Sequence, residues 1–263
     1  MKLFSPGIFF FLAFMSFTSS TVLAENSATP EFYEIKVYHF SNSGQEQLID
    51  NYLQHALLPA LHKLGIATTG VFKPIANDTA ADKRIFVLMP LKSMDQLLTL
   101  PGQLAKDASY NNSAQDYMDA AYNNLPYTRM ESILLQAFRL APTMQHPQLG
   151  EPQAERVYEL RSYESPTEKL HVNKVKMFND GGEIPLFKRL GFNAVFYADV
   201  INGSHMPNLM YMTSFNNMAS REEHWKTFGA DTEWKALSAQ PQYQHNVSKA
   251  DIILMHATPY SEL

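Results

Sequence analysis

Apolar and polar side chains alternate in two matching stretches of the chain, FYEIKVYHF at 32–40 and RVYELRSY at 156–163. Alternation with a period of two, in stretches rich in β-branched and aromatic residues, is typical of a β-strand. Three further strands are predicted after each stretch, near 67–75, 84–91 and 130–138, and near 193–200, 208–215 and 249–257. The pattern therefore predicts eight strands in two sets of four.

A helical pattern follows the first strand of each set. In the first set an apolar stripe has helical spacing and consists of Leu48, Ile49, Tyr52, Leu53 and Ala56. Gly65 and Gly191 then stand where a left-handed backbone commonly ends a helix. A second helix is predicted to begin near Ser93 and near Ser220, because a Gln or Glu three residues later completes a capping box. Each set thus reads strand, helix, strand, strand, helix, strand.

The two sets also match in sequence, which indicates a duplicated unit. LPALHKLGI (58–66) corresponds to IPLFKRLGF (184–192), and SILLQAF (132–138) corresponds to DIILMHA (251–257). Similarity at a domain-sized period indicates duplication of a folding unit rather than a solenoid. The order of elements is that of a ferredoxin-like unit.

We therefore expect an α+β protein built from two tandem ferredoxin-like βαββαβ units. The first unit would span 25–140, a proline-containing linker 141–155, and the second unit 156–263. A four-stranded sheet with both helices on one face leaves its other face bare. The two bare faces are expected to pack sheet to sheet, as an intramolecular dimeric α+β barrel.

A signal peptide is predicted at residues 1–24. Lys2 precedes the apolar run IFFFLAFMSF, and TSSTVLA supplies small residues before an expected cleavage after Ala24. The run is short for a membrane span and no second one follows it, although a retained anchor helix stays open as the alternative. We expect a periplasmic or secreted protein, of bacterial type, with no membrane span after removal of the signal.

Composition narrows the class of protein. The chain has 21 Lys and Arg against 26 Asp and Glu, a net charge of −5, and no basic run, so no nucleic-acid partner is expected. The absence of cysteine excludes disulfides and anchoring through a lipid-modified cysteine. With 45% hydrophobic residues, the chain is expected to form a globular protein with an ordinary core, and a homo-oligomer remains open.

Four motifs of the second unit resemble the NIPSNAP family, a branch of the dimeric α+β barrel superfamily. They are VYELRSY, GGEIPLFKRLGF, NLMYMTSFNNM and REEHWKTFGADTEWKAL. The resemblance is strong over 156–257 and weaker over 32–138, where Gly181-Gly182, Trp225 and Trp234 have no counterpart. It implies the barrel fold, and a superfamily that includes cofactor-free monooxygenases, haem-degrading enzymes and binding proteins.

A candidate site follows from the alternation on the first strand of each unit. The apolar side chains are expected to face the helices, and the polar ones the interior between the sheets, where unpaired charges are costly. There they would hold an anionic or carbonyl-bearing small molecule; the alternative is a pair of structural salt bridges that align the sheets. The expected ligand-binding residues are Glu34, Lys36, Tyr38, Glu159, Arg161, Tyr163 and Tyr211.

The sequence predicts neither a metal site nor a cofactor. The nine histidines form no HxH or HExxH pattern, although a single histidine as an axial haem ligand stays open. No dinucleotide fingerprint, P-loop or nucleophile elbow occurs, and no catalytic residue is assigned. Three functions remain: a small-molecule binding module, a cofactor-free monooxygenase or isomerase, and a non-catalytic interaction scaffold. An open cavity in the barrel would favour the first two, and a barrel filled by side chains the third.

Overall fold

The computed structural model describes Met1 and residues 28–263, so the expected signal peptide lies, Met1 apart, outside the described residues. The strands are β1 (Phe32–Phe40), β2 (Gly70–Pro74), β3 (Lys83–Leu91), β4 (Arg129–Ala137), β5 (Val157–Glu164), β6 (Asn193–Asn202), β7 (Asn208–Phe215) and β8 (Lys249–Ala257). The helices are α1 (Ser43–Tyr52), α2 (Leu58–Lys63), α3 (Met94–Leu104), α4 (Ala108–Met118), α5 (Glu168–Asn179), α6 (Glu183–Arg189), α7 (Met218–Ala230) and α8 (Thr232–Ser238). A π-helical turn, Leu53–Leu57, joins α1 to α2. All eight predicted strands are confirmed.

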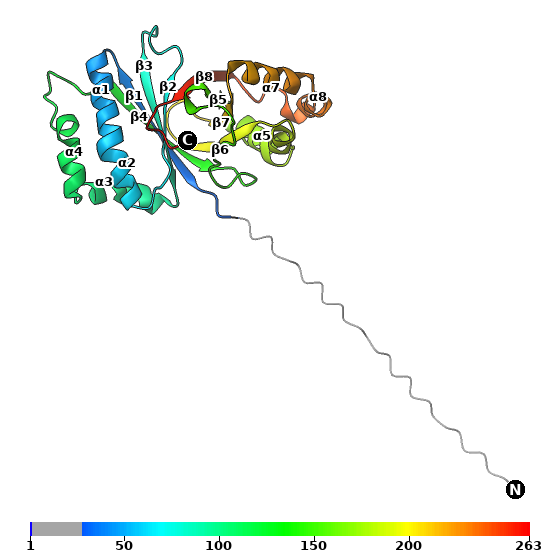
Figure 1. The fold of residues 1–263 in the computed structure, drawn as a ribbon. Coiled ribbons are helices and arrows are strands. Elements are labelled where there is room, and N and C mark those ends of the chain that lie inside the picture. Colours follow the sequence, from blue (N-terminus) through cyan, green and yellow to red (C-terminus); the bar gives the residue numbers. More distant parts are fainter. Residues whose placement is uncertain (2–27) are drawn as a thin grey trace.

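The strands form one closed antiparallel barrel in the order β1-β3-β2-β8-β5-β7-β6-β4. Strands β1–β4 are neighbours, as are β5–β8, and two seams join the groups. One seam pairs Phe72 with Ala257, and the other pairs Gln136 with Asp199. Helices α1–α4 cover one side of the barrel, and α5, α7 and α8 lie on the opposite side (Figure 1). The protein is thus an α+β fold around an eight-stranded barrel, whose closure leaves neither group with a free strand edge.

Apolar side chains fill the interior of the barrel, and every strand contributes to them. They include Tyr33, Ile35, Phe72, Phe86, Leu135, Tyr158, Leu160, Phe196, Met212 and Met255, all at most 4% exposed. Two further clusters lie outside the barrel, one under the helices of each half. Both faces of the strands are therefore buried, the inner one in a core of interdigitated aromatic and aliphatic groups.

The predicted orientation of β1 and β5 is wrong. Tyr33 and Ile35 of β1 and Tyr158 and Leu160 of β5 point into the barrel, whereas their polar neighbours point outward beneath the helices. An apolar interior satisfies the hydrophobic effect without burying charges between two sheets, where each charge would need a partner. The polar side chains reach partners and solvent only on the outer, helix-covered face.

The ends of the helices follow the predicted signals with one exception. Gly65 and Gly191 adopt φ of 78° and 76°, as predicted for residues that end a helix. Ser93 caps α3 by accepting a hydrogen bond from the backbone of Gln96. The helix predicted to begin near Ser220 begins at Met218, but the predicted cap is wrong, because the side chain of Asn217 caps α7 and accepts the Ser220 N–H. Asparagine is as good a cap as serine, and it stands three residues earlier.

The segment 258–263 ties the second half of the chain to the first. The backbone N–H of Thr258 donates to the carbonyl of Val71, and the Tyr260 hydroxyl donates to Asp50 Oδ1 over 2.5 Å. The side chain of Leu263 then enters the interior cluster. These contacts reinforce the barrel seam between β2 and β8.

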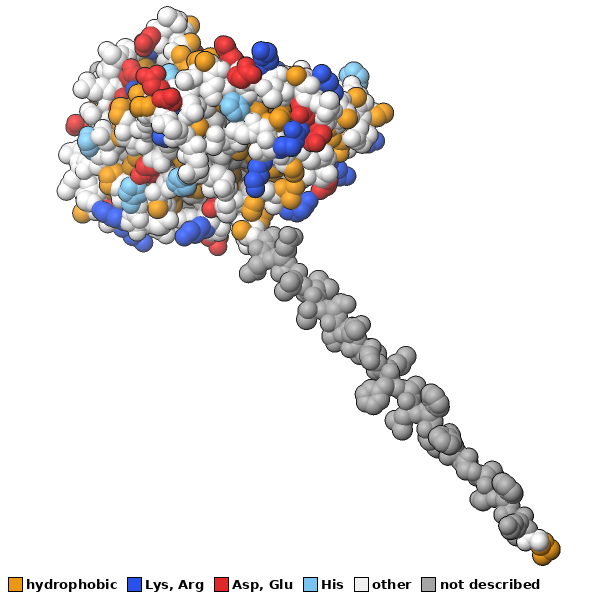
Figure 2. Space-filling view, turned by 45° about the vertical axis from the view of Figure 1, so that its right-hand side comes forward, with side chains coloured by type: hydrophobic (Ala, Val, Ile, Leu, Met, Phe, Trp, Pro, Cys, Tyr) orange, Lys and Arg blue, Asp and Glu red, His pale blue; other side chains and the backbone are white. Residues whose placement is uncertain are grey.

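No helix in the described part of the chain has the length and apolar character needed to cross a membrane. On the face seen in Figure 2, acidic and basic side chains are interspersed with apolar ones.

Candidate functional site

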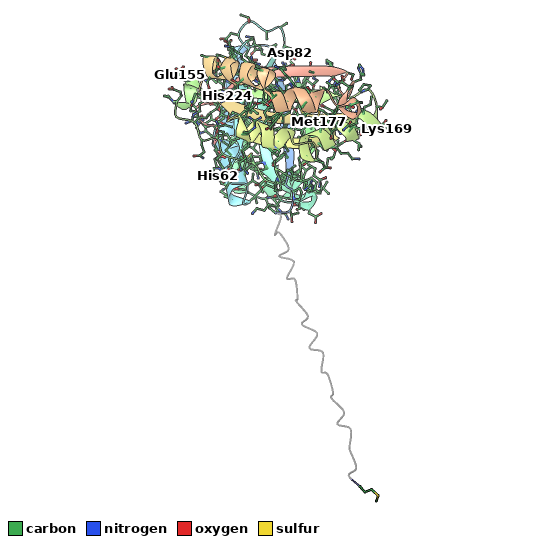
Figure 3. The ribbon with its side chains drawn as sticks, turned by 90° about the vertical axis from the view of Figure 1, so that its right-hand side faces the viewer. His62, Asp82, Glu155, Lys169, Met177 and His224 are labelled. Atoms are coloured by element: carbon green, nitrogen blue, oxygen red, sulfur yellow. The ribbon has the colours of Figure 1, made fainter. Side chains whose placement is uncertain are left out.

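The outer face of β5 places Glu159, Arg161 and Tyr163 under the helices of the second half. Figure 3 looks onto this side of the molecule, with Met177 on α5 and His224 on α7. Because side chains two apart on a strand share a face, these three form a row along β5. Helix α7 adds Arg221 and Trp225, which lie four residues apart and therefore on one helical face.

The carboxylate of Glu159 is the centre of the site and is fully buried. Its oxygens accept hydrogen bonds from Arg161 Nε over 2.5 Å, from Arg221 Nε over 2.8 Å and from Trp225 Nε1 over 2.8 Å, and a second Arg221 nitrogen lies at 3.2 Å. Burial alone would raise the pKa of this carboxyl, but the bonds from Arg221 and Trp225 and the charge of Arg161 lower it below the ordinary value. Glu159 is therefore ionised, and hydrogen bonds occupy both of its carboxylate oxygens.

Arg161 is held on three sides. Its guanidinium lies 3.6 Å from the centre of the Trp225 ring, and its Nη1 donates to the Tyr163 hydroxyl over 2.8 Å. The Tyr163 hydroxyl also lies 3.0 Å from that of Tyr211. Burial would lower the pKa of the guanidinium, but Tyr211, Tyr163 and Glu159 keep that pKa above its ordinary value. Planar stacking and fixed hydrogen bonds make Arg161 a rigid cation.

The charges of this cluster do not cancel, since two guanidiniums share one carboxylate. Within the described part of the chain, Arg161 Nη2 and Arg221 Nη1 donate no hydrogen bond. The side chains of Arg161 and Arg221 remain 13% and 21% exposed. The site therefore presents one uncompensated positive charge and spare N–H donors at a partly open surface.

A buried ion pair adjoins the cluster. Lys174 Nζ donates to Glu183 Oε2 over 2.8 Å, and both side chains are at most 7% exposed. The ammonium also lies 4.7 Å from the Phe178 ring centre and 5.8 Å from that of Tyr163. Glu183 begins α6 directly after Gly181-Gly182, so the diglycine turn brings its carboxylate to Lys174. This pair is electrically neutral and leaves the excess charge on the arginines.

The seven residues expected to form one site lie in two places. Glu159, Arg161, Tyr163 and Tyr211 are brought together as described, whereas Glu34, Lys36 and Tyr38 lie on the opposite, first-half side of the barrel. There Ser132 donates to Glu34 Oε1 over 2.7 Å, and Lys36 Nζ lies 3.8 Å from the same oxygen. Tyr38 packs against Tyr117 and Tyr127, and burial raises its pKa. The first-half residues thus form a smaller polar contact beside a cluster of tyrosines.

Sequence reasoning missed Arg221 and Trp225 as members of the site. The sequence did contain a signal, because Arg221 and Trp225 stand four residues apart on a predicted helix and so project from one face.

No group of three or more potential metal-ligating side chains occurs among the residues that the structure describes.

Comparisons with known proteins agree with this architecture. The NIPSNAP family model matches residues 158–262, the part of the chain whose motifs resemble that family. No curated protein sequence matches the chain.

Solved structures resemble the chain over most of its length. A candidate monooxygenase from Lactobacillus acidophilus covers 87% of this chain, with 94% of its own chain, at a TM-score of 0.54 and 10% identity. A second from Fusobacterium nucleatum covers 87% of this chain and 93% of its own, at a TM-score of 0.54 and 7% identity. A NIPSNAP family protein from Agrobacterium tumefaciens aligns 98% of its chain with 41% of this one, at 19% identity and a TM-score of 0.37. At these identities the similarity concerns the fold.

Proposed function

We propose that the protein binds a small organic anion, a carboxylate or another carbonyl-bearing anion, at Arg161 and Arg221. The observation that carries this proposal is the excess charge: two guanidiniums share the single carboxylate of Glu159 and keep spare N–H donors at a partly open surface. Guanidinium groups bind carboxylates in a planar, two-point geometry. The ligand site expected inside the barrel thus moves to the outer face of β5.

The surrounding residues support binding by fixing the donors in advance. Trp225 stacks on Arg161 and bonds to Glu159, so the guanidinium plane is set before any ligand arrives. A preorganised donor loses little side-chain entropy on binding. Tyr163 adds a hydroxyl beside Arg161 that can donate to a carbonyl oxygen. Such a site favours a ligand that carries one negative charge and a hydrogen-bond acceptor next to it.

Thermal unfolding with a panel of mono- and dicarboxylates, such as benzoate and succinate, tests this proposal. At least one of them should raise the unfolding temperature of the wild-type chain, as a ligand that binds only the folded state must. Arg221→Met should abolish the rise, because it removes the excess charge. Lys226→Met is the matched control, since Lys226 lies on the same helix with its side chain 80% exposed. A rise that persists in Arg221→Met would refute the proposal.

A cofactor-free monooxygenase is the second candidate, favoured by the two whole-chain structural neighbours described as candidate monooxygenases. The site would contribute through charge: both oxygens of Glu159 are engaged, and burial raises the pKa of Tyr211, so neither is suited to accept a proton. The arginines would instead stabilise an enolate or phenolate that reacts with oxygen. Oxygen uptake with phenolate-forming aromatic substrates, lost in Arg161→Met, would support this function.

The third candidate is a non-catalytic interaction scaffold. A barrel filled by side chains, rather than one with an open cavity, favours this candidate. The carboxylate panel and the oxygen-uptake measurement also test this candidate. If no carboxylate in the panel changes the unfolding temperature and no oxygen is consumed, the scaffold becomes the preferred function.

We also propose that the two halves arose from one ferredoxin-like unit and that the chain is exported. Support for duplication comes from the matching order of elements in the halves, and support for export from the residue pattern of 1–24. Superposition of 32–137 on 157–257 tests the first proposal. Mass spectrometry of exported protein tests the second, where an N-terminus at Glu25 is expected and an intact Met1 in a membrane fraction would contradict it.

A further inference from the structure

A second hollow lies where the segment between the two halves crosses α6 and β6. It has a volume of about 400 Å³, within the usual range for small-molecule sites. Residues 140–142 and 145–148 form one wall, and Ile184, Lys188, Phe192, Asn193, Ala194 and Tyr197 form the other. The hollow is separate from the arginine cluster on β5 and α7, with which it shares no residue.

A β-bulge in β6 lies beside the hollow. The register between β6 and β7 shifts between Ala194 and Phe196, and both Val195 and Phe196 lie in the barrel interior. The Val195 carbonyl accepts a hydrogen bond from the backbone N–H of Gln145 over 2.8 Å. Glu31 holds the same segment a few residues earlier, through its N–H to Pro142. Bulges re-aim the backbone in this way, and the segment is thereby fixed across the hollow as a wall.

The wall formed by α6 and β6 has a large apolar part, which we call the floor of the hollow. Phe192 and Tyr197 are 6% and 3% exposed, and both belong to the aromatic cluster under the helices of the second half. Ile184 and Ala194 pack against the same cluster. Proline side chains of the crossing segment face them from the other wall. An apolar group of a ligand would therefore replace water on both walls, which favours binding.

The charge of the lining has one sign. Lys188 is exposed at the end of α6, and its ammonium forms no ion pair or hydrogen bond with the part of the chain that the structure describes. His146 is the other ionisable cationic group of the lining, and no Asp or Glu is among the lining residues. A cation would find no charged partner in this lining, a neutral lipid would find only the apolar contacts, and an anion would find both.

We propose that this hollow binds an organic monoanion with an apolar body, whose carboxylate pairs with Lys188. The body lies against Phe192, Tyr197 and Ile184, and the charged end points to the open side where Lys188 stands. The inference does not depend on the proposed site at Arg161, since the two sites share no residue.

Isothermal titration of the full chain with dodecanoate, below its micelle concentration, tests the proposal. Dodecanoate should bind with one site per chain, and Lys188→Gln should weaken binding about tenfold by removing a charge-assisted hydrogen bond. Lys106→Gln, at an exposed lysine of the first half, is the matched control and should bind as the wild type does. Dodecanol and dodecyltrimethylammonium should bind at least tenfold more weakly, because they lack the anionic group.

Two further variants locate the site. Ala194→Leu narrows the hollow from its floor and should weaken dodecanoate binding, while its unfolding temperature reports whether the fold is kept. Arg221→Met should bind dodecanoate as the wild type does, which separates this hollow from the arginine cluster. Equal affinity for all three dodecyl compounds, or unchanged affinity in both Lys188→Gln and Ala194→Leu, would overturn the proposal.

Discussion

Arg161 and Trp225 form a stacked pair that joins strand β5 to helix α7, with 3.6 Å between the guanidinium carbon and the ring centre. The same tryptophan donates its indole N–H to Glu159. One aromatic residue thus fixes both the cation and the anion of the site. The stability of the site should therefore depend on Trp225 and Arg221 as much as on Arg161.

Arg161→Met removes a cation–π contact and the hydrogen bonds to Glu159 and Tyr163, but it also removes the cost of burying a charge, so it should lower the free energy of unfolding by only about 1 kcal/mol. Glu159 keeps its bonds from Arg221 and Trp225 in this variant and is not left unpartnered. Urea denaturation at pH 7 measures the change. A loss of ~3 kcal/mol or more, the usual cost of breaking a buried pair, would show that Arg161 alone compensates the buried carboxylate.

Glu159→Gln should lower the free energy of unfolding at pH 7 by about 3 kcal/mol, because it leaves two guanidiniums facing a neutral group. The pKa of Glu159 is lowered in the folded state, so its ionisation stabilises the fold above the unfolded-state pKa, near 4.5. That contribution is lost as the pH falls below 4.5 toward the folded-state pKa. The difference between wild type and variant should therefore shrink on acidification. Denaturation series between pH 7 and pH 3 check this, and a constant difference would contradict it.

Two tyrosines of β5 should respond in opposite ways to removal of the hydroxyl. Tyr158 points into the barrel, and its hydroxyl has no hydrogen-bond partner among the described residues. Tyr158→Phe should therefore leave stability unchanged or raise it by up to ~1 kcal/mol. The Tyr163 hydroxyl bonds to Arg161 and Tyr211, so Tyr163→Phe should cost about 1–2 kcal/mol. Thermal unfolding of both variants measures these changes. A larger loss of stability in Tyr158→Phe than in Tyr163→Phe would contradict the placement of Tyr158 inside the barrel and of Tyr163 on its outer face.

Gly181→Ala should destabilise the protein by more than ~1 kcal/mol. A Cβ at this position would stand 2.7 Å from the carbonyl oxygen of Met177, which α5 holds in place. Gly102 is the matched control, since it lies inside α3 and a Cβ there meets nothing within 4 Å. Gly102→Ala should stabilise the protein by about 0.5–1 kcal/mol. Equal effects in chemical denaturation would argue against a close approach at the diglycine turn.

The eight strands were predictable because alternation depends on local side-chain order alone. Which face of each strand lies inside was not predictable, because helices cover the outside of the barrel and both faces are buried. The polarity of Glu159 and Arg161 then says only that they need partners. Those partners, Arg221 and Trp225, come from a helix some sixty residues away, through contacts that the alternation of β5 cannot show.

The N-terminus of α7 shows a second limit of local reasoning. Asn217 and Ser220 are both good caps, and the sequence offers them three residues apart. The structure selects Asn217, whose side chain accepts the backbone N–H of Ser220. This places Arg221 and Trp225 well inside the helix, at positions fixed enough to hold the carboxylate of β5.

Because two seams within one chain close the barrel, its two halves need not have the same sequence. When such a barrel is assembled from two identical subunits, every substitution appears twice, once on each side. Here both sides belong to one chain, so each can change alone. The second half has tryptophan and arginine over β5, while the first half has tyrosines over β1. Selection can thus specialise one side for recognition while the other keeps the barrel closed.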